Sequence, residues 1–208
     1  MSIDLGKLTM RGIEVSLRPM EAGDAEAFAE AAAESREQYA YTPVPRGLSE
    51  ATEYIERAFR QRDAGQRYPF TILRHGRVVG STSYCEYQPW PWPAGCPMQR
   101  QDRPDACEIG YTWLAASAQR TRCNTEAKFL LLSHAFEVWN VHRVSLRTDV
   151  RNERSRRAIE RLGAKLDGVL RADKAGQDGA VRDSAFYSII AVEWPVVKER
   201  LGGFLAMK

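Results

Sequence analysis

The sequence is poor in the residues that build metal centres and disulfide frameworks. Its 208 residues include only four cysteines and three histidines. The cysteines stand singly without a C-x-x-C pair, and no pair of histidines stands at the spacing of a metal site; the cysteines are Cys85, Cys96, Cys107 and Cys123. Because zinc sites and disulfide frameworks depend on such spacings, we expect no metal and reduced thiols.

Long hydrophobic runs are absent as well. No segment approaches the roughly 18 apolar residues of a membrane-spanning helix, and the first twelve residues, MSIDLGKLTMRG, lack the apolar core of a signal peptide. The charges nearly balance, with 30 basic and 27 acidic residues and a net charge of +3. A balance this close does not favour nucleic acid as a partner. We therefore expect a cytoplasmic protein with no membrane and no nucleic-acid partner.

The hydrophobic pattern predicts one α/β domain. A chain of this length can bury one full core, and segments with alternating apolar residues are interspersed with segments of helical composition. The pattern predicts a mixed sheet. The expected strands are 15–20, 68–74, 78–87, 107–114, 143–149, 164–170 and 184–191, and the expected helices are 24–38, 49–64, 125–139, 153–162 and one from Pro195, with a Gly-rich loop at 172–182.

One segment is rich in proline and tryptophan. Residues 88–106, QPWPWPAGCPMQRQDRPDA, contain five prolines and two tryptophans, so they can form neither a regular helix nor a central strand. We interpret them as an insertion between two strands. Trp90 and Trp92 either pack this loop onto the body or contact a substrate or a second copy of the chain.

The segment 119–124, QRTRCN, has no glycine and contains two arginines just before an apolar helix. The N-terminus of a helix has backbone N–H groups without intrahelical acceptors and therefore attracts anions. Arg120 and Arg122 can add charge-assisted hydrogen bonds to such an anion. The alternative is a solvated polar loop, and Glu126 in the first turn of the helix would compete with an anion for the same dipole.

Three motifs together with the order of elements resemble the GNAT superfamily of acyl-CoA-dependent N-acetyltransferases. The motifs are EIGYTWL (residues 108–114), QRTRCNTEAK (119–128) and RNERSRRAIERLGA (151–164), and the match is closest to the RimJ/RimL-like branch. The order of elements agrees over nearly the whole chain. The resemblance implies a single domain over residues 1–208, with a mostly antiparallel sheet flanked by helices, a splayed central strand pair and acetyl-CoA as co-substrate.

The resemblance also implies how coenzyme A is held. The superfamily's loop, commonly Q/R-x-x-G-x-G/A, binds the pyrophosphate through backbone N–H groups, and here Arg122 and Asn124 replace the two glycines. Asparagine tolerates left-handed backbone angles, and arginine can add a hydrogen bond to phosphate. The pantetheine arm is expected to pair with the strand backbone. The expected coenzyme A contacts are Thr112, Leu114, Gln119, Arg120, Thr121, Arg122, Cys123, Asn124, Thr125 and Asn152.

Acetyl transfer to an amine needs one group to remove a proton and another to assist the leaving thiolate. The resemblance implies Glu108 as the general base and Ser155 as the general acid. Many relatives place a tyrosine seven residues after the asparagine, but that position is Ile159 here, which cannot donate a proton. A surface role for Glu108 and a purely local capping role for Asn152 and Ser155 remain the alternatives.

The acceptor is left open by the sequence. A small-molecule amine and a peptide N-terminus both fit the resemblance, and the Pro/Trp-rich insertion favours the small molecule slightly because it suggests an enclosed mouth. Three further alternatives also remain open. The protein could use another donor such as succinyl-CoA, or it could be an acyl-CoA-binding module without catalysis. A homodimer is open as well.

Overall fold

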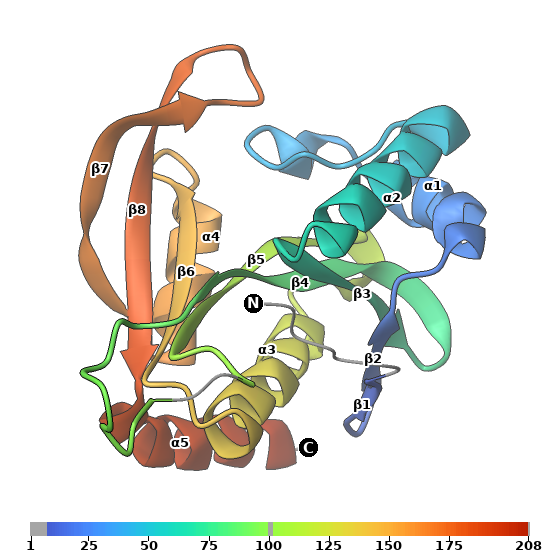
Figure 1. Cartoon of the computed structure of the whole chain (residues 1–208). Coiled ribbons are helices and arrows are strands. Elements are labelled where there is room, and N and C mark those ends of the chain that lie inside the picture. Colours follow the sequence, from blue (N-terminus) through green and yellow to red (C-terminus); the bar gives the residue numbers. More distant parts are fainter. Residues whose placement is uncertain (1–7, 100–101, 208) are drawn as a thin grey trace.

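A single mixed sheet forms the centre of the molecule (Figure 1). The computed structural model describes residues 8–99 and 102–207. In those residues the sheet has eight strands in the order β1-β2-β3-β4-β5-β6-β8-β7, and only β5 and β6 pair in parallel. The strands are β1 (Met10–Arg11), β2 (Val15–Pro19), β3 (Arg67–Arg74), β4 (Arg77–Gln88), β5 (Ala106–Leu114), β6 (Arg143–Asp149), β7 (Lys165–Ala175) and β8 (Val181–Ile190). The predicted single-domain α/β fold with a mostly antiparallel sheet is confirmed.

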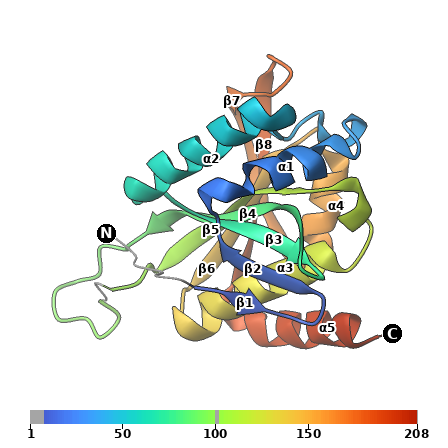
Figure 2. The same cartoon turned by 90° about the vertical axis from the view of Figure 1, so that its right-hand side faces the viewer.

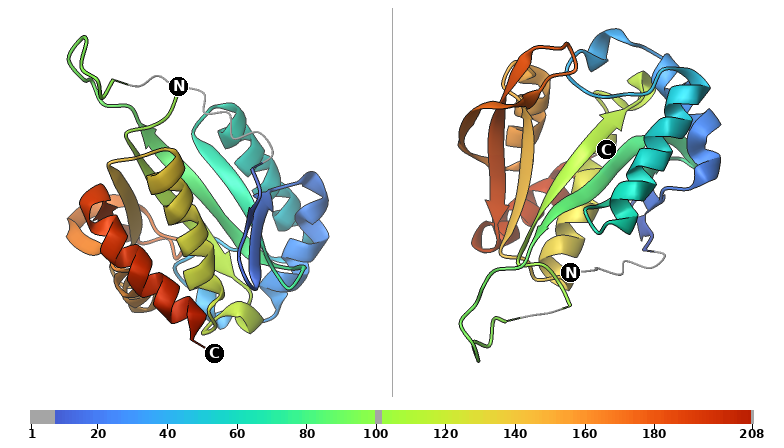
Figure 3. Two further views of the ribbon diagram at one scale, coloured as in Figure 1. Left: turned by 90° about the horizontal axis from the view of Figure 1, so that it is seen from below. Right: turned by 45° about the horizontal axis from the view of Figure 1, so that its top comes forward.

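Helices cover both faces of this sheet. Figure 2 shows α1 (Ala25–Ala33) and α2 (Gly47–Asp63) above the strands, with α3 (Cys123–Ser133) and α5 (Trp194–Ala206) below them. The view from below in Figure 3 places α3 and α5 side by side. The remaining helix, α4 (Glu153–Leu162), contacts α5 through Arg200, whose Nη2 donates to the Arg161 carbonyl over 2.7 Å.

The central strand pair is splayed, as expected. Strands β5 and β6 are paired only where 106–108 lie beside 143–145, and beyond Glu108 the two strands diverge (Figure 3, right). On its other side β5 stays paired with β4 as far as Leu114, with a register shift near Tyr111, whose φ is +53°. The divergence leaves backbone groups of β5 and β6 without each other as partners, and such groups need another partner.

The structure corrects several predicted boundaries. Helix α2 begins at Gly47 and not at Ser49, because Glu50 accepts the backbone N–H of Arg46 (2.8 Å) and so fixes the preceding turn. Most of the loop predicted at 172–182 is strand, since β7 continues to Ala175 and β8 starts at Val181. Helix α3 starts at Cys123, two residues earlier than predicted, and continues as a π-helix over His134–Val138.

Asp105 holds the Pro/Trp-rich insertion together, and the rings of Trp90 and Trp92 pack it against His142. Asp105 accepts the Trp90 backbone N–H (2.7 Å) and the Trp92 indole N–H (2.9 Å). The Trp90 ring stacks on His142 with a centroid distance of 5.1 Å. Residues 100 and 101 of the predicted insertion lie outside the described residues. In the described part of the loop, both tryptophans therefore anchor it to the start of β6.

Candidate active site

A cavity of about 830 Å³ opens between the splayed strands. Its walls come from β5 and β6, the N-terminal half of α3, residues along the length of α4, the loop between α1 and α2, and the end of the β7–β8 hairpin. Neither Trp90 nor Trp92 is among its lining residues. No described residue of the insertion, 88–99 or 102–106, lines this cavity, so the sequence argument for an enclosed mouth loses its basis.

Most of the residues expected in the site line this one cavity. Both proposed catalytic residues do so, as do the strand, loop and helix positions Thr112, Leu114, Gln119, Arg120, Thr121, Asn124 and Asn152. Arg122, Cys123 and Thr125 are not among its lining residues. The splay, the helix N-terminus and α4 thus bring together segments that lie far apart in the sequence.

The loop before α3 is held by side chains. Gln119 Nε2 donates to the Leu114 carbonyl (2.7 Å), and its Oε1 accepts from Arg154 (3.0 Å). Thr121 donates to the Ala118 carbonyl (2.7 Å) and accepts the Cys123 backbone N–H (3.1 Å). These contacts fix the loop so that the remaining first-turn N–H groups of α3, which have no intrahelical acceptor, can face an anion.

The left-handed backbone position of this loop is Arg120, with φ +57°. Arg122 is the N-cap of α3, and its φ of −72° is an ordinary right-handed value. The conformation that favours glycine therefore falls two residues before the first of the superfamily's glycine positions. At Arg122 the backbone alone gives no reason for glycine.

The two arginines of the loop point to different places. Arg122 Nη1 donates to the carbonyl of Leu205 at the end of α5 (3.2 Å). Its side chain borders a second cavity of about 540 Å³ with Glu14, Arg74 and Phe204, whereas Arg120 borders both cavities. The structure therefore brings Arg120, and not the Arg122 side chain, to the large cavity.

Glu126 does not oppose an anion at the helix N-terminus. Its carboxylate is 3% exposed and accepts backbone N–H groups from Ile13 and Glu14 before β2. The negative charge is thus used to hold the N-terminal strands against α3, away from the cavity.

Glu108 is buried and lies on the wall of the cavity, which excludes a surface role. Arg147 on β6 forms an ion pair with its carboxylate at 3.1 Å, and the Cys85 thiol lies 3.8 Å from Oε1. Burial raises the pKa of Glu108, while the Arg147 charge acts in the opposite direction. A carboxylate with a raised pKa is a stronger base, as proton removal from an amine requires.

Asn152 and Ser155 lie at the start of α4. Asn152 Oδ1 accepts the Ser155 backbone N–H (3.1 Å), so the predicted N-cap is confirmed. The side-chain oxygen of Asn152 is therefore used in a local capping bond. Asn152 and Ser155 both line the cavity as well. Ile159, one turn further, is 7% exposed and lines it too.

Sequence reasoning missed Lys128. This lysine is 4% exposed and lines the cavity from the second turn of α3. Its Nζ donates to Thr112 Oγ1 over 2.6 Å. The available signal was a single charged residue within the apolar stretch AKFLLLSHAF (127–136), where a lysine cannot reach solvent easily.

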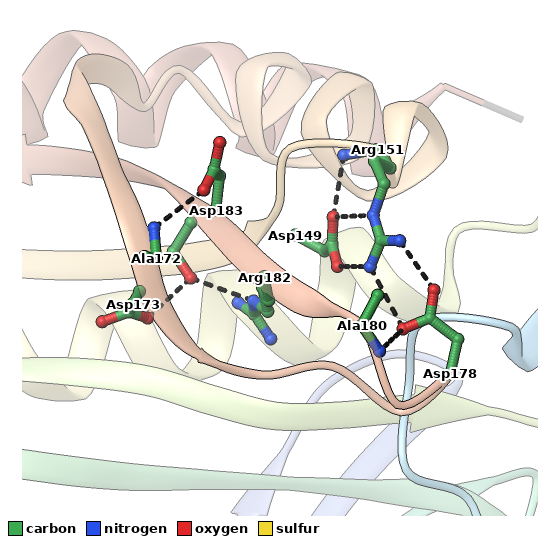
Figure 4. Close-up of polar contacts among 9 residues, drawn as sticks. Asp149, Arg151, Ala172, Asp173, Asp178, Ala180, Arg182 and Asp183 are labelled. Atoms are coloured by element: carbon green, nitrogen blue, oxygen red, sulfur yellow. Dashed lines mark hydrogen bonds and ion pairs between the residues drawn. The ribbon is translucent and has the colours of Figure 1, made fainter.

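Polar contacts join the β7–β8 hairpin to the segment between β6 and α4 (Figure 4). Arg151 forms ion pairs with Asp149 (2.7 Å) and with Asp178 at the tip of the β7–β8 hairpin (2.6 Å), and its guanidinium lies 4.8 Å from the ring centroid of Tyr41. The Arg151 hydrogen bond lowers the pKa of Asp149. These contacts connect the hairpin to the loop between α1 and α2, which lies at the same end of the molecule (Figure 1).

A second set of contacts shapes the hairpin itself (Figure 4). Arg182 Nε donates to Ser184 Oγ (2.9 Å), and Ser184 donates to Asp173 (2.7 Å). Asp183 accepts the Ala172 backbone N–H (2.8 Å). Arg182 is thereby held on the cavity wall.

Residues 8–99 and 102–207 contain neither a candidate metal cluster nor a candidate membrane-spanning helix. No cluster of three or more His, Cys, Asp or Glu side chains in these residues could hold a metal ion. No helix formed by these residues is long and apolar enough to cross a membrane.

Comparison with known proteins identifies the family. The family model described as "Acetyltransferase (GNAT) domain" matches residues 14–165, which is more than half of the chain. The chain therefore belongs to the GNAT acetyltransferases, the enzymes that transfer an acyl group from coenzyme A to an amine. The predicted superfamily is confirmed.

Individual relatives agree with this assignment. The chain is 33% identical to a "putative acetyltransferase" from T. thermophilus, with a TM-score of 0.79 and coverage of 95% of this chain and 96% of that one. It is 36% identical over 87 residues to the Bacillus subtilis (strain 168) protein named "Putative ribosomal N-acetyltransferase YdaF", a match that covers 42% of this chain and 46% of that protein. The curated relative is thus matched over about half its length.

The fold is also that of Mycobacterium smegmatis RimJ in complex with CoA-disulfide. That structure is 23% identical to this chain and has a TM-score of 0.74, with coverage of 95% of this chain and 93% of that one. Relatives named for the RimJ/RimL-like branch are therefore among the matches, as the sequence motifs predicted.

Proposed function

We propose that this protein transfers the acetyl group of acetyl-CoA directly to a primary amine, with Glu108 as general base and Ser155 as hydrogen-bond donor to the departing sulfur. The observation that carries the proposal is the single cavity at the splay, which both side chains line together with the N-terminus of α3. Its volume of about 830 Å³ suits a cofactor-sized ligand.

The residues present fit coenzyme A along the whole cavity. First-turn N–H groups of α3, with Arg120 and Arg154 beside them, would hold the phosphates. Beyond Glu108 strand β5 has no pairing with β6, and its backbone near Thr112 and Leu114 would pair with the amides of the pantetheine arm, although the Leu114 carbonyl already accepts from Tyr39 and Gln119. Asn152 would reach the same arm from α4.

Glu108 would remove the proton from the attacking amine, either directly or through a water molecule. Its raised pKa suits this step, and Arg147 keeps the carboxylate oriented on the cavity wall. A backbone N–H of β5 would polarise the acetyl carbonyl. Direct attack needs no covalent enzyme intermediate. Burial raises the pKa of the Cys107 and Cys123 thiols, so neither is an activated nucleophile.

For the acceptor we favour the N-terminus of a peptide or protein. The reason for preferring a small molecule was the Pro/Trp-rich insertion, and its tryptophans do not line the cavity. A relative that carries the name of a ribosomal N-acetyltransferase supports a protein substrate. Mass spectrometry of a panel of peptides with free or blocked N-termini, together with small amines, tests this choice. Acetylation of free peptide N-termini is expected, and acetylation confined to small amines would overturn it.

Arg120→Ala should weaken coenzyme A binding more than Arg122→Ala. A lost hydrogen bond to a charged group costs roughly 1–3 kcal/mol. Arg122 points to the end of α5, so its removal should change the binding free energy by less than about 0.5 kcal/mol. Calorimetry at low salt measures both values.

Arg120→Gly separates the charge of Arg120 from its backbone. Glycine relieves the left-handed position but removes the guanidinium, so its coenzyme A affinity should lie near that of Arg120→Ala if the charge is what matters. Wild-type affinity in Arg120→Ala, with a loss in Arg122→Ala, would contradict the assignment.

A further inference from the structure

Lys128 is an amine in the interior of the site. It lies four residues after Asn124 on α3, so both side chains emerge on the same helix face, and both line the large cavity. The residue is only 4% exposed. A lysine is rarely buried to this extent without a specific partner.

The partners of this amine are hydroxyl groups. Lys128 Nζ donates to Thr112 Oγ1 on β5 (2.6 Å) and to Thr82 Oγ1 on β4 (3.3 Å), and the two hydroxyls lie 2.8 Å apart. An ammonium group has three N–H donors, so one remains after these two contacts. Two threonines cannot neutralise the charge as a carboxylate would.

The environment of Lys128 brings the pKa of its amine close to neutral pH, so that both the charged and the neutral form are populated there. Burial lowers the pKa of Lys128 to about 7, while Glu108 on β5 and Cys85 on β4 act in the opposite direction. A free thiol has a pKa of about 8.5. The amine is thus a weaker base than a thiolate and can give its proton to one.

The amine also lies where the leaving sulfur is expected. Beyond Glu108 strand β5 has lost β6 as a neighbour, and the left-handed Tyr111 changes the register just before Thr112. The proposed function places the pantetheine arm along this stretch. Nζ is 2.6 Å from Thr112 Oγ1, and the charge of Glu108, the proposed base, acts on it, so the amine lies close both to the stretch assigned to the arm and to the base.

We propose that Lys128 is a further catalytic residue, whose ammonium group gives a proton to the departing thiolate of coenzyme A; this rests on the proposed function. The acceptor nitrogen forms its bond to the carbonyl carbon, and the carbon–sulfur bond breaks with its electron pair on sulfur. One proton moves from Nζ to sulfur, which gives the free thiol and a neutral lysine. The proton of the acceptor nitrogen leaves through Glu108, and Lys128 regains one from water.

Lys128 and Ser155 then have different tasks. The Ser155 hydroxyl can stabilise the sulfur with a hydrogen bond, but it does not titrate near neutral pH and cannot be the source of the proton. An amine with its pKa near the working pH is suited to be that source.

The pH dependence of thiol release reports on this step. The full chain is assayed at saturating acetyl-CoA and peptide acceptor, and kcat is measured as a function of pH. In wild type kcat should fall as pH rises through the pKa of Lys128, about 7, because the neutral amine has no proton to give, whereas Lys128→Met should be slower and lack this fall.

Two further variants separate charge from position. Lys128→Gln keeps a donor for the threonines without the charge and should behave like Lys128→Met. Lys198→Met removes an exposed lysine of α5 that pairs with Glu137 (2.6 Å) and does not line the cavity, so it should keep the wild-type pH profile.

The same kcat and the same pH profile in wild type, Lys128→Met and Lys128→Gln would overturn the role of Lys128 and leave the proposed function standing. Failure of the wild type itself to bind coenzyme A would overturn both.

Discussion

Glu108→Gln should lower kcat/KM for the acceptor by roughly 10²–10⁴-fold, the range for loss of a general base. Glutamine has nearly the same shape and can still accept a hydrogen bond from Arg147, but it cannot take a proton at neutral pH. Coenzyme A affinity should stay within about twofold, because the cofactor's charged groups are assigned to the α3 end of the cavity. Steady-state kinetics and calorimetry measure the two quantities.

The pH dependence of the loss of kcat/KM in Glu108→Gln shows whether Glu108 acts as a base. In wild type the base works only when it is deprotonated, so activity should fall as pH drops through the raised pKa of Glu108. At high pH the acceptor loses its proton without help, so the gap between wild type and Glu108→Gln should shrink.

Glu86→Gln is the matched control for Glu108→Gln. Glu86 is an exposed carboxylate that also pairs with Arg147 (3.1 Å) but does not line the cavity. This variant should keep kcat/KM within about twofold of wild type, as expected for an exposed ion pair. An equal loss of kcat/KM in Glu108→Gln and Glu86→Gln, or a loss in Glu108→Gln that does not change with pH, would contradict the role of Glu108 as a base.

Ser155→Ala should lower kcat about 10- to 100-fold, because a hydrogen bond to a charged sulfur contributes roughly 1.5–3 kcal/mol. Asn152 should still cap α4, since the bond that it accepts comes from the Ser155 backbone. The melting temperature should therefore change little, and the loss should appear in kcat more than in coenzyme A affinity.

Ile159→Ala provides the comparison for Ser155→Ala. It removes a buried side chain one turn further along α4, so it should reduce stability by about 1–4 kcal/mol and affect kcat much less than Ser155→Ala does. Full kcat in Ser155→Ala together with a selective loss of activity in Ile159→Ala would show that the α4 positions have been assigned wrongly.

The sequence predicted best those elements whose limits depend on local contacts. Strand Arg143–Asp149 and helix Glu153–Leu162 begin and end at the predicted residues. The helix is fixed by the Asn152 cap and by Gly163, whose φ of +101° ends it. Both are short-range signals that residue types carry by themselves.

Elements that depend on pairing with distant segments were predicted less well. Residues 172–175 and 181–183 belong to β7 and β8, although their composition is typical of a loop. Their conformation is set by the hairpin partner and by polar contacts such as Ser184 with Asp173. Context of this kind overrides the preferences of single residues.

The details of the site could be predicted only in part. The motifs placed Glu108 and Ser155 in one region, and the structure shows them on one cavity. Arg120 faces that cavity because of its left-handed backbone, and Arg122 is turned away by its contact with α5. No sequence pattern predicts either feature. Lys128 was overlooked because a lysine is normally taken as exposed.

Release of free thiol from acetyl-CoA is the most direct test of the central claim. The purified chain is mixed with acetyl-CoA and peptides with free N-termini, and both the thiol and the acetylated peptide are quantified over time. The account predicts thiol and product in equal amounts, with both formed roughly 10²–10⁴-fold more slowly by Glu108→Gln at neutral pH. Tight coenzyme A binding without thiol release for any acceptor, peptide or small amine, would contradict catalysis and leave the chain an acyl-CoA-binding module.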